Sequence, residues 1–150
     1  MIMSNRASWN TAAGLRRTLE LLPPDLLIVL SLDPAGNAYA PLGHCTENHL
    51  YAPEPEQNPA TVTPCMTLWP RPVLSGQQTE GLTVRQICDR LLRIHPGAPI
   101  VLAHDPEGNT YSTLRAYSYG RLYYNPAADT AHALSADPQS GPECAVFWPR

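Results

Sequence analysis

Two stretches of this sequence, LPPDLLIVLSLDPAGNAY at residues 22–39 and IHPGAPIVLAHDPEGNTY at residues 94–111, follow one pattern 72 positions apart. In each stretch an aliphatic run precedes Asp-Pro-x-Gly-Asn, and a tyrosine follows after one more residue. The aliphatic run favours a β-strand, while proline and glycine at these spacings are typical of a hairpin turn. Each stretch therefore predicts a strand, a turn and a return strand that begins at Tyr39 or Tyr111.

The same offset continues upstream, where apolar residues recur at the i, i+4, i+7 spacing of one helical face. These residues are Leu15, Leu19 and Leu22 in the first stretch and Ile87, Leu91 and Ile94 in the second. Thr83 and Gln86 stand three residues apart ahead of the second helix, as in a capping box. The pattern predicts two helices of about three turns, each ended by the prolines that follow.

Downstream, CMTLWPR at residues 65–71 matches CAVFWPR at residues 144–150, now at an offset of 79. We expect a closing strand in each segment and a weaker third strand near Leu50-Tyr51 and near Leu122-Tyr123. Residues 52–64, which several prolines interrupt, are interpreted as a loop, as are residues 125–142.

Repetition at this many positions predicts a tandem duplication. The expected fold is α+β, with an αβββ(β) unit at residues 11–70, a linker at 71–81 and a second unit at 82–150. A unit of about 70 residues buries too little surface to be stable alone. We therefore expect the two units to pack as a pseudo-twofold pair with antiparallel sheets, forming one compact unit that is monomeric.

Composition narrows the class of protein. The chain has 150 residues, 16.4 kDa and a formal charge of −3, which disfavours a protein that coats duplex nucleic acid. The polar start at residues 1–11 and the lack of a long apolar run predict neither a signal peptide nor a membrane anchor, so we expect a cytoplasmic protein. The four cysteines show no Cys-x-x-Cys spacing and are expected to be free thiols.

The repeated motifs resemble those of small, uncharacterised proteins of bacteriophages and prophage-bearing bacteria. That group combines a short helix, Leu-Pro-x-Asp, an aliphatic strand, Asp-x-Glu-Gly-Asn, a tyrosine and a closing strand that ends in Trp-Pro. The first unit matches at residues 22–25, 33–39 and 68–70, and the second at residues 105–111 and 147–149. Ala35 replaces the usual acidic residue, and residues 94–97 depart from Leu-Pro-x-Asp. The resemblance implies a phage accessory protein that acts in the host cell, and it carries no activity, cofactor or site residues.

Positions that recur in both units are interpreted first as structural. Asp33 and Asp105 fit the first position of a turn, where a carboxylate accepts backbone hydrogen bonds. The repeated tyrosines and tryptophans fit packing between strands or units. The alternative is a pair of pockets at the seam between the units, which would bind a small nucleotide-like ligand through Asn37, Tyr39, Asn109 and Tyr111.

The sequence holds only weak patterns of catalytic and metal-binding residues. His44, Cys45 and His49, with Glu47 between them, offer metal-ligand types but no second ligand pair at a recognisable distance, so we interpret them as a solvated loop. His104-Asp105 could serve Cys45 or Cys88, yet no nucleophile elbow, phosphate loop or paired carboxylate accompanies them. We predict no catalytic residues, no metal and no cofactor.

The most informative difference between the units lies at residues 114–124, LRAYSYGRLYY. If this segment is extended, its period of two places Arg115, Tyr117, Tyr119, Arg121 and Tyr123 on one face. Arginine and tyrosine dominate the energetics of protein interfaces. We predict a non-enzymatic binding protein that uses this face to inhibit or tether a host or phage macromolecule, in the first instance a protein. The alternatives are the nucleotide-like ligand at the seam and a structural component of a virion or its assembly.

Overall fold

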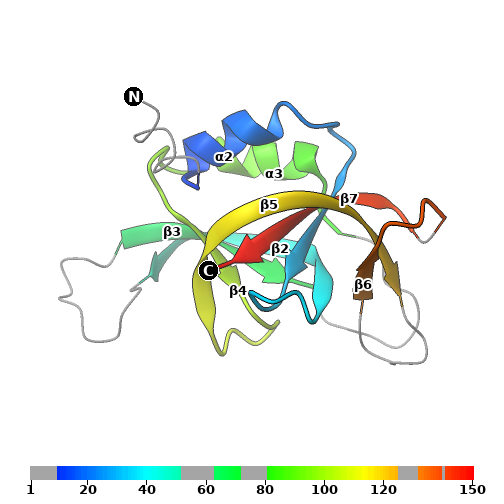
Figure 1. Ribbon diagram of the computed structural model, residues 1–150. Coiled ribbons are helices and arrows are strands. Elements are labelled where there is room, and N and C mark those ends of the chain that lie inside the picture. The colour runs from blue at the N-terminus through cyan, green and yellow to red at the C-terminus, as the bar shows by residue number, and fades with distance from the viewer. Residues whose placement is uncertain (1–9, 52–62, 72–80, 125–131, 140) are drawn as a thin grey trace.

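The computed structural model describes residues 10–51, 63–71, 81–124, 132–139 and 141–150. Over these residues the chain is a mixed α/β protein with two helices and a seven-stranded sheet. The elements are α2 (Ala12–Leu19), β1 (Leu27–Ser31), β2 (Tyr39–Tyr51), β3 (Thr63–Pro70), α3 (Val84–Leu91), β4 (Ile100–Ala103), β5 (Tyr111–Tyr124), β6 (His132–Ser135) and β7 (Glu143–Pro149). The helices lie side by side over one side of the sheet (Figure 1).

Both helices begin at a threonine cap. The Thr11 side chain accepts a hydrogen bond from the Gly14 backbone, and Thr83 forms with Gln86 the capping box that the sequence predicts. Each helix has only eight residues, which makes the prediction of three turns wrong. Leu22 and Ile94 lie beyond the helix ends, in the turns that lead to the next strands, although both still pack on the core.

The strands follow the order β1-β7-β5-β4-β3-β2-β6, and β1 also pairs with β2. The first six strands in that order therefore form a closed ring. Two of its pairs, β1 with β7 and β3 with β4, are parallel, so the prediction of antiparallel sheets is wrong. Parallel pairing arises because the closing strand of each half of the chain inserts beside the first strand of the other half. Strands of the two halves thus share one sheet.

The predicted third strands are not separate elements. Residues 50–51 and 122–123 are the ends of the long strands β2 and β5, of 13 and 14 residues. The register is irregular within both strands: β2 shifts between Leu42 and His44 and again between Thr46 and His49, and β5 shifts between Leu114 and Ala116. A bulge bends a strand without ending it.

The loop predicted at residues 125–142 is also partly wrong, because His132–Ser135 forms β6 and pairs with β5 and with Tyr39 of β2. Residues 125–131 and 140 lie outside the described residues. The same holds for 52–62 of the first predicted loop, whose last residues, Thr63 and Pro64, begin β3, and for 72–80 of the predicted linker.

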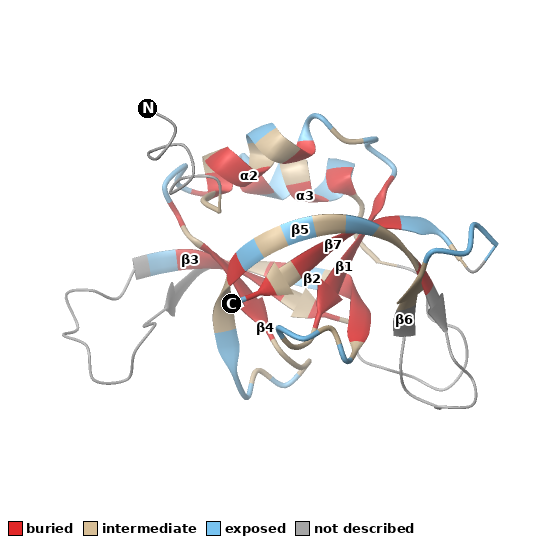
Figure 2. Ribbon diagram, in the orientation of Figure 1, coloured by how far each residue is buried: buried red, intermediate tan, exposed pale blue. Residues whose placement is uncertain are grey.

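The main core fills the space between the helices and the sheet (Figure 2). Its fully buried members include Leu15 and Ile87 from the helices and Leu30, Leu102 and Phe147 from the strands. A second, smaller cluster on the other face of β1 and β7 joins Val29 and Val146 to residues of β2 and β5. None of the helices among the described residues is long and apolar enough to cross a membrane.

Candidate binding surfaces

Two tyrosines of β5 stand on an exposed face of the sheet. Tyr117 pairs with Phe147 and Tyr119 with Ala145, so both are held in regular antiparallel register. The rings contact each other edge to face, with centroids 6.3 Å apart, and they remain 38% and 55% exposed. Between them Ser118 faces the other way and accepts a hydrogen bond from the Trp148 indole. Alternation along β5 therefore leaves an aromatic pair available to solvent.

An arginine lies on each side of this tyrosine pair along β5. Arg115 occupies the bulge of the strand, is exposed, and donates through Nε to the Pro149 carbonyl at 3.3 Å. Arg121 donates through Nη1 to the Gly141 carbonyl at 3.1 Å, and its Nη2 lies 3.6 Å from the Glu143 carboxylate. These contacts hold the guanidinium groups beside the strand. Tyr123, the fifth predicted residue, pairs with Ala133, but its side chain lies outside the described residues.

The repeated aromatic residues form two pairs. Trp148 contacts Tyr39 and Trp69 contacts Tyr111, both edge to face. Tyr39 is 8% exposed, and burial raises its pKa above the ordinary value, whereas Tyr111 is 41% exposed. Trp69 donates from its indole to the Thr46 hydroxyl at 2.9 Å. This agrees with the packing roles that the sequence predicts for these residues.

The aspartates that open the two hairpin turns bind their own backbone. The Asp33 carboxylate accepts from the Ala35 and Asn37 amides, at 2.8 and 3.1 Å. The Asp105 carboxylate accepts from three backbone amides and from the Asn109 side chain. The hydrogen bond that the Asn37 backbone amide donates to Asp33 is the largest influence that lowers the pKa of that carboxyl, and the bond from the Asn109 amide does the same for Asp105. Both turns lie on the side of the sheet away from the helices (Figure 1).

The four residues predicted for a ligand at the seam are thus engaged in these turns and aromatic pairs. Asn37 and Asn109 bind the aspartate of their own turn, and the two tyrosines each contact a tryptophan. The ligand stays a prediction.

The segment interpreted as a solvated loop with weak metal character is part of β2. His44 stacks on Trp69, with ring centroids 5.6 Å apart and planes 4° from parallel. Cys45 packs in the main core, where burial raises the pKa of its thiol. The side chain of His49 lies outside the described residues. Within the part of the chain that the structure describes, no three metal-ligating side chains gather.

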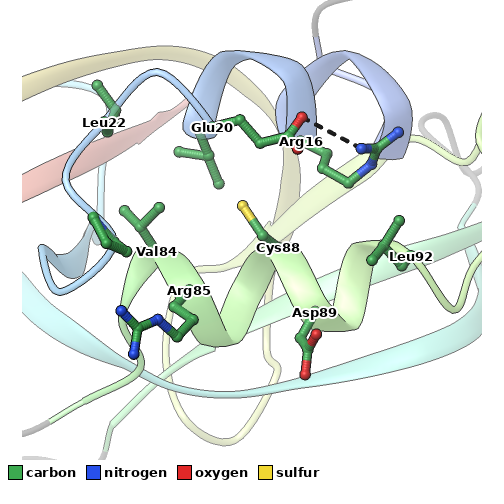
Figure 3. Close-up of a pocket in the computed structure, with 10 residues that line it drawn as sticks. Arg16, Glu20, Leu22, Val84, Arg85, Cys88, Asp89 and Leu92 are labelled. Atoms are coloured by element: carbon green, nitrogen blue, oxygen red, sulfur yellow. Dashed lines mark hydrogen bonds and ion pairs between the residues drawn. The ribbon is translucent and has the colours of Figure 1, made fainter.

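A groove of about 350 Å³ lies between the two helices, and sequence reasoning missed it (Figure 3). Its lining combines apolar side chains and Cys88 with the charged residues Arg16, Glu20, Arg85 and Asp89. Leu92, one of the apolar residues, is 64% exposed. Ion pairs join Arg16 to Glu20 at 3.3 Å and Arg85 to Asp25 at 3.6 Å. The groove depends on how the helices pack against each other, and no pattern within either helix predicts it.

Comparison with known proteins gives no relative: the chain matches no family model, no curated protein and no solved structure.

Proposed function

We propose that the chain is a tandem duplication whose two units pack about a pseudo-twofold axis. The pairing registers support this. Val29 pairs with Pro41, and Val101 with Thr113, exactly 72 positions later on both strands. Ile28 pairs with Ala145 in the parallel pair β1–β7, and the corresponding parallel pair joins Met66 to Ile100. Both offsets of the sequence repeat, 72 and 79, thus recur in the pairings.

Contacts at the helix starts support the same proposal. Val84 donates its amide to the Leu26 carbonyl and Ala12 donates to the Ala98 carbonyl, each at 2.9 Å. The amides of the following residues donate to the carbonyls of Pro24 and Pro96, also at 2.9 Å. Each helix therefore docks on the chain that precedes the first strand of the other unit. Under this proposal the two units need each other to complete their structure.

We further propose that the protein binds a macromolecule, in the first instance a protein, through the face of β5 formed by Arg115, Tyr117, Tyr119, Arg121 and Tyr123. The observation that carries the proposal is the exposed Tyr117–Tyr119 pair with a tethered arginine on each side. Tyrosine and arginine bury a large contact area and keep a polar end for hydrogen bonding, which is why they dominate interface energetics. Side chains already held in place lose less conformational entropy on binding.

This surface belongs to one unit only. The first unit has Cys45 at the position that corresponds to Tyr117, and Cys45 is buried in the main core. Glu47 corresponds to Tyr119, which reverses the chemistry from aromatic to acidic. We therefore expect one partner for each chain. In line with the resemblance to phage and prophage proteins, we propose that the protein acts in the cytoplasm as an accessory factor that inhibits or tethers its partner.

The test is capture from an extract of the cells that carry the gene, with the tagged full-length chain as bait. Arg115→Ala combined with Tyr119→Ala should lower recovery of the captured partner by more than about tenfold, because two hot-spot truncations together exceed about 2 kcal/mol. Arg17→Ala with Arg93→Ala is the matched control, since both arginines are exposed and neither belongs to β5. Circular dichroism should show the same fold for both variants.

Retention of the partner by the Arg115/Tyr119 variant would overturn the proposed surface. Loss of the partner on changing Asn37 and Asn109 instead would favour the seam between the units. Recovery of the chain only in purified virus particles would favour a structural role.

A further inference from the structure

His104 bridges two hydroxyl groups in the second hairpin. Its Nε2 lies 2.6 Å from the Ser112 hydroxyl, and its Nδ1 lies 2.9 Å from the Thr110 hydroxyl. The backbone fixes this arrangement: Leu102 pairs with Ser112 in the β4–β5 register, and the His104 amide donates to the Thr110 carbonyl at 3.0 Å. Hydrogen bonds thus link a serine to an imidazole and the imidazole to a third group that orients it.

The first hairpin shows that the turn does not need these polar residues. The corresponding positions, 72 earlier, are Leu32, Ala38 and Ala40, and the Leu32 amide still donates to the Ala38 carbonyl at 2.9 Å. Both hairpins close with glycine at positive φ, 77° at Gly36 and 76° at Gly108. The three polar side chains therefore occur together in one hairpin without being required by its backbone.

We propose that Ser112 is a nucleophile, with His104 as its base, and that this pair reacts with small activated acyl esters. A serine within hydrogen-bond reach of a base that is itself oriented by a third group is the arrangement by which enzymes activate a hydroxyl. Thr110 is a positioning residue: its hydroxyl accepts from Nδ1–H, which leaves the lone pair of Nε2 for the Ser112 hydroxyl. Sequence reasoning considered His104 only with Asp105 and the cysteines, because the serine comes close only when the hairpin forms.

The reaction begins when the Ser112 oxygen bonds to the acyl carbon and its proton moves to His104 Nε2. The bond between the acyl carbon and the leaving oxygen then breaks, and the leaving alcohol takes the proton from Nε2. A water molecule then bonds to the acyl carbon of the acyl-serine and gives a proton to Nε2. The bond between the acyl carbon and the Ser112 oxygen breaks, this oxygen takes the proton from Nε2, and the carboxylic acid is released. Ser112 and His104 return to their initial state, and no oxidant or reductant is consumed.

The pair is accessible and its base is in the required form. Neither His104 nor Ser112 is buried, and Thr110 is exposed. Partial burial lowers the pKa of His104, against the opposing influence of the Asp105 and Asp33 carboxylates, so the imidazole is neutral at pH 7. A neutral imidazole can accept the serine proton.

The experiment exposes the full-length chain to a fluorophosphonate probe, which forms a stable phosphorus–oxygen bond with activated serines, and maps the modified residue by mass spectrometry. We expect one adduct, at Ser112, and none in Ser112→Ala. His104→Gln should slow the adduct by at least about a hundredfold, the range of general-base catalysis. Ser118→Ala is the matched control on the same strand and should not change the rate, since the Ser118 hydroxyl accepts from the Trp148 indole.

One further measurement, on the wild-type chain, does not depend on whether the variants fold. The rate of modification of the wild-type chain should rise with pH through a midpoint below 6.5, the ordinary pKa of histidine. Absence of a Ser112 adduct in the wild-type chain would overturn the inference. So would a rate of adduct formation that is the same in His104→Gln as in the wild-type chain. The partner-capture experiment tests residues 115–123, whereas the probe reacts at Ser112, on the other side of the β5 bulge. Failure of the one and failure of the other are therefore distinguishable.

Discussion

Trp148 of β7 packs against Tyr39 of β2, with ring centroids 5.7 Å apart and an interplanar angle of 88°. The indole also lies against the first hairpin turn, since a Cβ placed on Gly36 would meet it at 2.9 Å. Trp69 of β3 contacts Tyr111 and the turn at Gly108 in the same way, with centroids 5.6 Å apart and an angle of 87°. The closing strand of each half thus carries a tryptophan that covers the hairpin of the other half.

Removing either tryptophan should destabilise the whole chain by a similar amount. Trp69→Ala and Trp148→Ala each delete an edge-to-face contact with a hairpin tyrosine and an indole hydrogen bond, to Thr46 or to Ser118. Trp69→Ala also deletes the stack with His44, which is exposed. Large-to-small aromatic changes in cores cost about 3–5 kcal/mol, and these rings are half-buried, so we expect about 2–4 kcal/mol for each. Urea unfolding followed by circular dichroism measures both values.

Tyr119→Ala provides the comparison for these variants, because its exposed ring should cost less than about 1 kcal/mol. If Trp148→Ala unfolded the chain while Trp69→Ala left it unchanged, the proposed equivalence of the two halves would be wrong.

The two turn glycines should not tolerate a side chain. Gly36 and Gly108 have positive φ, and a Cβ at either would press on the tyrosine hydroxyl of its own hairpin and on the tryptophan that covers it. Gly36→Ala and Gly108→Ala should each lower the free energy of unfolding by about 1–3 kcal/mol, seen as a lower midpoint of urea unfolding. Gly97→Ala is the control, since among the described residues the atoms near that position belong to the exposed His95 ring. A thermal melt of Gly108→Ala that matched the native chain would contradict the steric argument.

Local sequence chemistry predicted much of this fold. The Asp-Pro-x-Gly-Asn motifs gave both hairpins, and Thr83 with Gln86 gave the start of α3, because turn and cap preferences depend on residues that are close in sequence. The parallel pairing of β3 with β4 was not predicted. Such pairing depends on which strands meet when the chain folds. The alternation of apolar and polar residues along one strand does not indicate which strand will pair with it.

Of the candidate sites, too, the features that depend on local sequence were predicted and those that depend on distant residues were not. Alternation along residues 114–124 predicted the side of β5 that carries Tyr117 and Tyr119, because period two is a local property. The groove between α2 and α3 and the contact of His104 with Ser112 depend on packing between elements or across a turn. The bulge at Arg115 also escaped prediction, since an extra residue in one strand is defined only relative to the strand beside it.

The turn aspartates should make stability depend on pH at the acid end. Hydrogen bonds from backbone amides lower the folded-state pKa of Asp33 and Asp105 below the ordinary 3.8. A lowered pKa means that the stabilisation is fully present above the unfolded pKa and is lost as the pH falls through the folded pKa. Asp33→Asn with Asp105→Asn should therefore reduce the loss of unfolding free energy between about pH 5 and about pH 2.

Chemical unfolding at a series of pH values measures this difference. Glu107→Gln is a suitable control, because its side chain carries a charge in the same exposed turn. An acid-side slope that stayed the same in the aspartate double variant would show that other groups control the acid transition.

The cysteines should react with alkylating reagents in an order set by burial. Burial raises the pKa of Cys144 to about 12, so almost none of its thiol is ionised near pH 8, and the side chain is inaccessible as well. Cys88 lines the groove between the helices and is half-buried, whereas the other three cysteines are buried. Burial and then the Glu20 carboxylate raise the pKa of the Cys88 thiol. Iodoacetamide should therefore modify Cys88 first and Cys144 last, as followed by mass spectrometry of digested samples over time. All four should react at similar rates in urea, and early modification of Cys144 in the folded chain would show that β7 opens far more readily than its place in the sheet implies.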